Sequence, residues 1–332
     1  MRLAEISDEL SAARTNKREF LNRLEAIIPW EEFIKIIKPS YYKGEVGNKP
    51  YPLELMLRIF ILQNVYNLAD MAVMNEVIDS RAFSDFCGIN SPNEVPNGDT
   101  IGRFRNILTE NGLQEKIFEK VVKMLTERNL ILKKGTIVDS TFIESSSSTK
   151  NKDKKRDPEA HSGKKGNTWH FGYKAHIGAD EENGLVHKIK TTPANESDVT
   201  VMSELLHGEE ERAYGDSHGE EERAYGDSGY IGAKKRPEAI KKNKDGKNIK
   251  YIINRRPSSI KKLSRSGQYS AKKREYQRSS VRCKVEHVFA VVKNIFHYRK
   301  TRYRGLRKQN AKLNIIFALA NLYLADRKSL TV

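Results

Sequence analysis

The segment Ser280-Val-Arg-Cys-Lys-Val-Glu-His-Val-Phe-Ala-Val-Val-Lys293 carries two stripes of side chains at helical spacing. At about 100° per residue, the first stripe is apolar, as in a helix packed against a core. The second stripe holds Arg282, Glu286 and Lys293. It has two interpretations: ordinary helix surface charge, where an Arg and a Glu four apart contribute about 0.2–0.5 kcal/mol, or a functional carboxylate flanked by phosphate-binding cations. The apolar stripe consists of Val281, Val285, Val288, Val292 and Phe296.

The composition is strongly basic. The 332 residues include 60 Lys and Arg against 43 Asp and Glu, which gives a net charge of +17. This charge indicates a polyanionic partner, nucleic acid foremost. The most apolar segment, 314–325, is too short for a bilayer span, so we expect a core helix and no membrane association. Residues 1–24 lack an apolar secretory core, and the two cysteines form no disulfide framework, so a cytoplasmic location is expected.

Most of the excess charge lies in the second half of the chain. The segment 232–278 holds 17 Lys or Arg and three acidic residues, which predicts a track for a phosphate backbone. Within it, 250–254 is a candidate strand. A second basic run, 299–308, contains no acid, and Tyr298 and Tyr303 are interleaved with its cations, as on many nucleic-acid surfaces. A solvated face of the protein is an alternative that explains either basic run taken alone, but it does not readily explain both.

Residues 1–112 are predicted to form a helical domain. Helices are expected from Pro52 onward, over 70–78, and over 99–108 with Asp99 as the N-cap. Pro92, Pro96 and Gly98 indicate a loop before the last of these. The short helices and their arginines fit a DNA-binding helix-turn-helix, but a plain helical subdomain fits equally well.

The pattern changes to strands in the following domain, 113–332. Residues 135–143 are β-branched and aromatic on both sides of Asp139. Because an unpaired buried charge is costly, Asp139 suggests a metal or active site, although a turn or cap aspartate is the alternative. The Ser/Lys-rich segment 145–166 is expected to be a loop.

Two further strands, 169–178 and 185–192, are predicted to form a hairpin around Asn183-Gly184. His170, His176 and His187 lie on them without the spacing of a zinc site. A helix is expected next, capped by Ser197 or Asp198 and ending at Leu206.

Residues 207–217 and 218–228 are identical. Eleven residues are too few, and two copies too few, for a repeat architecture, so the segment is interpreted as a tandem duplication with one copy surplus to the fold. Each copy ends in Gly-Asp-Ser, so either Asp227 or Asp216 can supply the second acid of a set of three. In chain order, the three acids are then Asp139, Asp227 and Glu286. We expect the second copy to form the strand.

These features resemble the DDE transposases of bacterial insertion sequences, in particular the insertion-sequence-five family. The resemblance rests on Thr136-Ile-Val-Asp-Ser-Thr141, Trp169-His-Phe-Gly-Tyr-Lys-Ala-His-Ile-Gly178, Tyr225-Gly-Asp-Ser-Gly-Tyr230, the Arg282, Glu286 and Lys293 spacing, and in the N-terminal part Tyr51–Arg58 and Asp99–Arg105. It spans nearly the whole chain. Two departures stand out: Ser279 occupies the position of the signature tyrosine, which leaves Tyr276 as its substitute, and the duplication makes the second aspartate ambiguous.

The resemblance implies an α/β (α+β) chain, with the helical N-terminal domain followed by an RNase H-like mixed-sheet catalytic domain. It implies a DNA transposase that cleaves and joins strands at the ends of its element, as a homodimer or larger assembly. A nuclease without strand transfer, or a DNA-binding copy impaired by the duplication, are the alternatives. Oxygen ligands favour Mg²⁺ or Mn²⁺, two ions in this case. The implied catalytic and metal-binding residues are Asp139, Asp227 and Glu286, and the implied DNA-binding residues are Arg282, Lys293, Lys174, His176, Arg299, Arg302 and Arg304.

Overall fold

The computed structural model describes residues 14–42, 49–150, 154–206, 223–236 and 250–329. The chain divides into two compact units, Met1–Phe118 with Asp326–Val332, and Glu119–Ala325. The division falls within helix α8, a few residues after the predicted boundary at 112. The last residues of the chain belong to the first unit, which the sequence did not indicate.

The first unit is helical, as predicted. Buried apolar side chains from every helix form its core, with α4 buried almost all round. The expected N-cap Asp99 is wrong: Asn97 caps α7, and its side chain accepts a hydrogen bond from the Thr100 N–H at 2.8 Å. The helices are α2 (Asn16–Ile27), α3 (Trp30–Tyr41), α4 (Leu53–Val65), α5 (Asp70–Asp79), α6 (Arg81–Cys87), α7 (Gly98–Glu110) and the start of α8 (Leu113–Glu127), with a 3-10 turn, η1 (Pro92–Glu94).

The second unit is built around a mixed sheet. Antiparallel strands β4, β3 and β1 lie side by side in that order, and β5 and β6 follow, each parallel to its neighbour. Three antiparallel strands followed by two strands parallel to the first is the RNase H-like arrangement, so the predicted fold class is confirmed. The strands are β1 (Gly135–Glu144), β2 (His161–Lys165), β3 (Thr168–Asp180), β4 (Val186–Pro193), β5 (Arg223–Gly226) and β6 (Lys250–Ile253).

The predicted hairpin is confirmed in β3 and β4. Gly184 turns it with φ of +66°, a left-handed conformation that favours glycine. The predicted loop at 145–166 is wrong in one part, because β2 pairs with the first residues of β3. Its sequence, His-Ser-Gly-Lys-Lys, has no apolar alternation, so only its partner strand makes it a strand.

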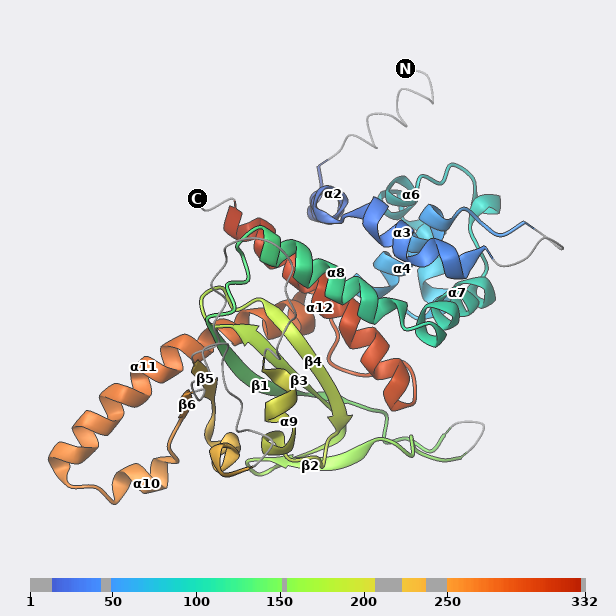
Figure 1. Ribbon diagram of the computed structural model, residues 1–332. Helices are drawn as coiled ribbons and strands as arrows, with labels where there is room; N and C mark the ends of the chain where they lie inside the picture. Colours follow the sequence, from blue (N-terminus) through green and yellow to red (C-terminus); the bar gives the residue numbers. More distant parts are fainter. Residues whose placement is uncertain (1–13, 43–48, 151–153, 207–222, 237–249, 330–332) are drawn as a thin grey trace. The chain divides into compact units, whose positions relative to one another are not determined.

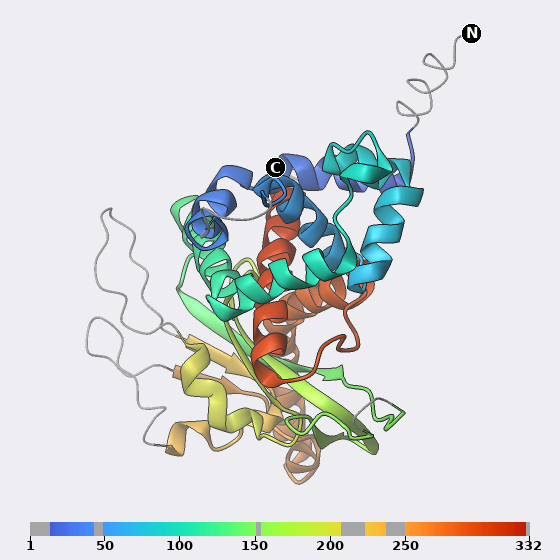
Figure 2. The same ribbon diagram turned by 90° about the vertical axis from the view of Figure 1, so that its right-hand side faces the viewer.

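Helices cover both faces of this sheet (Figures 1 and 2). Helix α9 (Asp198–Leu205) packs on one face, where Val138 of β1 joins its core cluster. Helices α11 (Arg265–Ala290) and α12 (Leu306–Ser329) lie on the other face. Asn321 of α12 bonds both the N–H and the C=O of Val186 in β4, at 2.9 and 2.7 Å, so α12 is the core helix that the sequence predicted.

The segment that opened the sequence analysis lies at the end of α11. Val285, Val288, Val292 and Phe296 are fully buried, whereas Val281 is only partly buried, so the apolar stripe is confirmed apart from its first member. The α-helix ends at Ala290 and continues as a π-helical turn, η5 (Val291–Ile295), which contains Lys293. Such turns often occur at functional sites.

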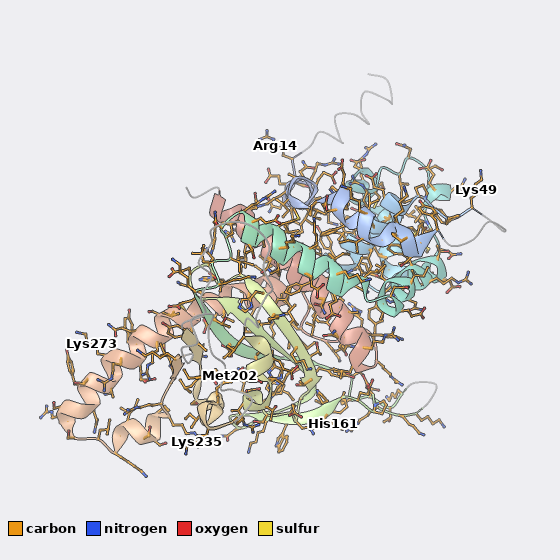
Figure 3. All side chains as sticks on the ribbon, viewed as in Figure 1. Arg14, Lys49, His161, Met202, Lys235 and Lys273 are labelled. Carbon is orange, nitrogen blue, oxygen red and sulfur yellow. The ribbon has the colours of Figure 1, made fainter. Side chains whose placement is uncertain are left out.

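The first half of α11 and the short helix α10 (Pro257–Lys261) extend beyond the sheet edge as an arm (Figure 1). Lys273 lies on this arm, on the part that leaves the sheet (Figure 3). Tyr269 and Tyr276 are 74% and 77% exposed on the same stretch. Within the described ranges, none of the helices is long and apolar enough to cross a membrane.

Candidate active site

Two aspartates meet where β5 ends beside the middle of β1. The parallel ladder pairs Gly135 with Arg223, Thr136 with Ala224 and Ile137 with Tyr225. Continued by two positions, this register sets Asp139 level with Asp227. Asp139 therefore lies on β1 and Asp227 directly follows the neighbouring parallel strand β5, so the ladder of the two strands fixes the relative height of the carboxylates.

Asp139 is partly buried and faces α11. Its Oδ1 accepts the N–H of Ser140 at 2.8 Å, and its Oδ2 accepts a hydrogen bond from Arg282 Nη2 at 3.2 Å. Burial raises the pKa of Asp139, the neighbouring Arg282 opposes that rise, and the charge of Asp227 adds to it. Asp227 is thus close enough for its charge to raise the pKa of Asp139.

Asp227 follows β5 and begins a 3-10 turn, η2 (Ser228–Tyr230). Its Oδ1 accepts the Gly229 N–H at 2.8 Å, which fixes the direction of the carboxylate. Strand β5 and Asp227 come from the second copy of the duplicated segment, as expected. The first copy, with Asp216, lies outside the described residues.

Glu286 lies on α11, one turn after Arg282, and its side chain is exposed. Within the described part of the chain, no three His, Cys, Asp or Glu side chains lie close enough together to hold a metal ion. The structure therefore brings Asp139, Asp227 and Arg282 together and leaves Glu286 at the edge of this group. The pair of oxygen ligands from Asp139 and Asp227 fits a hard divalent cation, because a positive ion would offset both the burial of Asp139 and the repulsion between the two carboxylates.

Cations gather near the far end of β1. Lys293 is partly buried in the π-helical turn, and its burial together with the charges of Lys165 and Arg299 lowers its pKa. Arg299 donates to the Lys293 carbonyl at 3.1 Å and bonds the side chain of Asn294. Like charges held this close indicate a site that an anion would stabilise.

The basic run after α11 divides into surface and core residues. Arg302 and Arg304 are exposed, and Arg304 donates to the Lys155 carbonyl at 3.1 Å. Tyr298, predicted to lie on a nucleic-acid surface, is instead fully buried, with its hydroxyl bonded to Gln309 at 2.7 Å. The burial of Tyr298 could not be predicted from the sequence, because alternating aromatic and basic residues suit a core loop and a surface equally.

Two predicted phosphate-binding residues bond to groups of the protein itself. Lys174 and His176 are buried on β3, where Lys174 donates to Asp198 Oδ1 at 3.0 Å. His176 bonds Thr192 at 2.8 Å, and burial lowers its pKa to about 4. Both side chains thus have protein partners on the face of β3 that α9 covers, and their contact with phosphate stays a prediction.

Sequence reasoning missed Asp198 and Tyr230 as members of this region. Asp198 was expected only as a possible helix cap, and Tyr230 only as part of a motif. Ser279, in the position of the signature tyrosine, accepts a hydrogen bond from Asn254 at 3.2 Å. Tyr276, its proposed substitute, lies out on the exposed arm.

The fold and the paired aspartates define the second unit as an RNase H-like domain with an acidic site. Comparison with known families gives the rest: residues 131–322 match the family described as "Transposase DDE domain", and residues 8–106 match "Transposase domain (DUF772)". The chain belongs to the DDE-domain transposases. No solved structure matches it.

Proposed function

We propose that this transposase serves a bacterial insertion sequence of the kind resembled by the insertion-sequence-five family, binding the ends of its own element and catalysing strand cleavage and strand transfer. The observation that carries the proposal is the pairing of Asp139 and Asp227 on adjacent parallel strands, with Arg282 of α11 bonded to Asp139. In a metal-dependent nucleotidyl-transfer site, neighbouring carboxylates hold the metal ions that act on the phosphodiester.

Asp139 and Asp227, with Glu286 as the third ligand, would hold Mg²⁺ or Mn²⁺. When bound, such ions activate the attacking oxygen and stabilise the leaving oxygen of a phosphodiester. The support for Glu286 in this role is helical spacing: it follows Arg282 by one turn, and Arg282 reaches Asp139.

The chain's own residues prepare the site. Arg282 favours the ionised form of Asp139 against its burial, and the Gly229 N–H holds one oxygen of Asp227 so that the other is free to turn toward Asp139. The Ser140 N–H donates to the other oxygen of the Asp139 carboxylate, Oδ1, and so restrains its orientation together with Arg282.

Phosphate binding is assigned to the cations around the π-helical turn. Lys293, with its lowered pKa, gains most from an anion, because a phosphate would relieve its repulsion with Lys165 and Arg299. Arg302 and Arg304 extend the basic surface along the same loop. The arm carries lysines and two exposed tyrosines, and it belongs to the basic segment 232–278. This segment would extend the track for the DNA backbone.

The test is cleavage of a DNA fragment that carries the element's own ends, with MgCl₂, by the full chain and by a version lacking residues 207–217. We expect both proteins to cut and to produce joined strands, and Asp139→Ala or Asp227→Ala to abolish both products. Cutting without joining would identify a nuclease. Cutting by the shortened version alone would identify an impaired, DNA-binding copy, and retention of cutting by Asp227→Ala would overturn the assignment of the site.

A further inference from the structure

Asp198 has no role in the site as described so far, yet it sits at its inner edge. It is the first residue of α9, and its Oδ1 accepts a hydrogen bond from Lys174 Nζ at 3.0 Å. The same ammonium group donates to the Glu196 carbonyl at 2.8 Å. The Lys174 and Asp198 side chains are 11% and 23% exposed, so the pair is largely removed from solvent.

Lys174 is the only cation that balances Asp198 among the described side chains around it. His176 Nδ1 lies 3.6 Å from Asp198 Oδ1, but burial lowers the pKa of His176 to about 4, so the ring is neutral at neutral pH. Its other nitrogen is bonded to Thr192. The imidazole therefore fills space beside Asp198 without neutralising it.

The other oxygen of Asp198 faces the turn that holds Asp227. A methyl group at Gly229 would lie 3.4 Å from Asp198 Oδ2 and 2.9 Å from Asp227 Oδ1, so the two oxygens are less than about 6.3 Å apart. No side chain at Gly229 separates them. At such a distance inside a protein, two like charges interact strongly enough to affect each other's orientation.

Tyr230 is a buried side chain close to Asp198 and Asp227. Its ring is fully buried in the cluster of Val138, Met202 and Leu205, and its hydroxyl has no hydrogen-bond partner within the described residues. The charges of Asp198, Asp139 and Asp227 all add to the effect of burial in raising the pKa of Tyr230. One buried phenol is thus near all three carboxylates.

We propose that Asp198 is a positioning residue of the carboxylate site, which keeps Asp227 turned toward Asp139 by neutralising Lys174 and occupying the space on the α9 side of Gly229. The proposal rests on the function proposed above. Without the negative charge of Asp198, the buried Lys174 ammonium would attract Asp227 away from Asp139. Removing both charges would cancel this effect.

The test uses MnCl₂ as probe and the full chain. Mn²⁺ binding without DNA is followed by electron paramagnetic resonance, and Mn²⁺-dependent DNA cleavage is measured in parallel. For Asp198→Asn we expect Mn²⁺ affinity to fall about 10- to 100-fold, the range typical for residues that orient metal ligands, with DNA affinity in the absence of metal unchanged. The double variant Asp198→Asn/Lys174→Met should recover most of the Mn²⁺ affinity.

Glu204→Gln is the matched control, since Glu204 is an exposed acid on the same helix that pairs with Lys190 at the surface. It should bind Mn²⁺ as the parent does. A lower melting temperature for Asp198→Asn with unchanged Mn²⁺ affinity would overturn the proposal in favour of a structural role, as would a double variant no better than the single one. If Asp139→Ala also leaves Mn²⁺ binding and cleavage intact, the proposed function itself fails, which is a separate result.

Discussion

Arg282 of α11 donates a hydrogen bond to Asp139 of β1 at 3.2 Å, across 143 positions of sequence. The guanidinium opposes the effect of burial on the carboxylate, and the carboxylate anchors the helix that carries Glu286. One ion pair thus links the strand with the first acid to the helix with the last. The free energy gained from this ion pair is reduced because Asp139 is partly removed from water and lies next to a second aspartate.

Asp139→Asn is expected to abolish metal-dependent cleavage while leaving the melting temperature at pH 7 unchanged or higher. The pKa of Asp139 is raised in the folded state, so folding favours its protonated form, and this group costs stability once the pH rises through its folded pKa. An amide avoids that cost. Calorimetry should show the difference between the two proteins shrinking as the pH falls toward about 3.9, the ordinary pKa of aspartate, and disappearing below it. A variant much less stable at pH 7 would contradict this.

Gly229→Ala is expected to lower cleavage more than stability. The new methyl group would lie 2.9 Å from Asp227 Oδ1, closer than a normal contact, so the carboxylate must turn. The backbone at Gly229 is not left-handed, which leaves folding tolerant of alanine. We expect turnover to fall at least about tenfold, since catalytic groups misplaced by about 1 Å lose up to two orders of magnitude. Gly112→Ala, with open space around it but a left-handed backbone, serves as the contrast: it should lose stability and keep turnover per folded molecule.

Asn321→Ala should destabilise the second unit by about 2–4 kcal/mol. It removes two hydrogen bonds to Val186 and leaves a buried N–H and C=O unpaired. Urea unfolding of the full chain measures the loss. Lys308→Ala, at an exposed position of the same helix, should stay within about 0.5 kcal/mol of the parent protein. Equal losses in the two variants would contradict the role given to Asn321.

Lys293→Ala is expected to weaken DNA binding about equally on all sequences and to reduce the slope of log Kd against log salt by about one. Its lowered pKa reflects burial and two neighbouring cations, so a phosphate there has more to gain than at an isolated lysine. Fluorescence anisotropy in about 50 to 300 mM NaCl, a roughly sixfold range of salt concentration, measures the Kd and its salt slope. Lys123→Ala on α8 is the control and should keep the parent slope.

His176→Gln should reduce acid destabilisation. Burial lowers the pKa of His176 to about 4 in the folded chain, whereas an unfolded histidine titrates near 6.5. As the pH falls from about 6.5 toward 4, the unfolded chain therefore binds a proton that the folded chain does not bind. This difference lowers the free energy of unfolding. The shift corresponds to about 3 kcal/mol. Urea midpoints at pH 7 and pH 4.5 should differ less for the variant than for the parent protein. An unchanged difference would show that His176 is not a buried neutral side chain.

Several elements followed from local sequence alone. The alternating residues around Asp139, the Asn183-Gly184 turn and the apolar stripe from Val285 to Phe296 each carry a period or a turn residue that only one local structure satisfies. The choice of Asp227 over Asp216 came from the resemblance, because only Asp227 lies in the segment Tyr225-Gly-Asp-Ser-Gly-Tyr230 that carries it. The resemblance supplied the fold class, a helical domain followed by an RNase H-like mixed sheet.

The surroundings of the site depended on contacts that the sequence does not encode locally. Strand β2 has no strand pattern and exists because β3 offers a free edge. Lys174 and His176 were expected at a phosphate, and both also bond to groups of the protein itself, since the alternation of β3 and the position of α9 decide which face each side chain meets. Asp198 entered the site only through folding.

What the sequence determined by itself was the type of most elements, though not of β2, together with the acidic residues and the excess of cations, since periodicity, turn chemistry and net charge are properties of neighbours along the chain. The tertiary structure decided which acids meet. The parallel register of β1 and β5 sets Asp139 beside Asp227, and the packing of α11 and α9 delivers Arg282 and Asp198 to them. These are distances between residues far apart in sequence, and only the burial of one shared core fixes them.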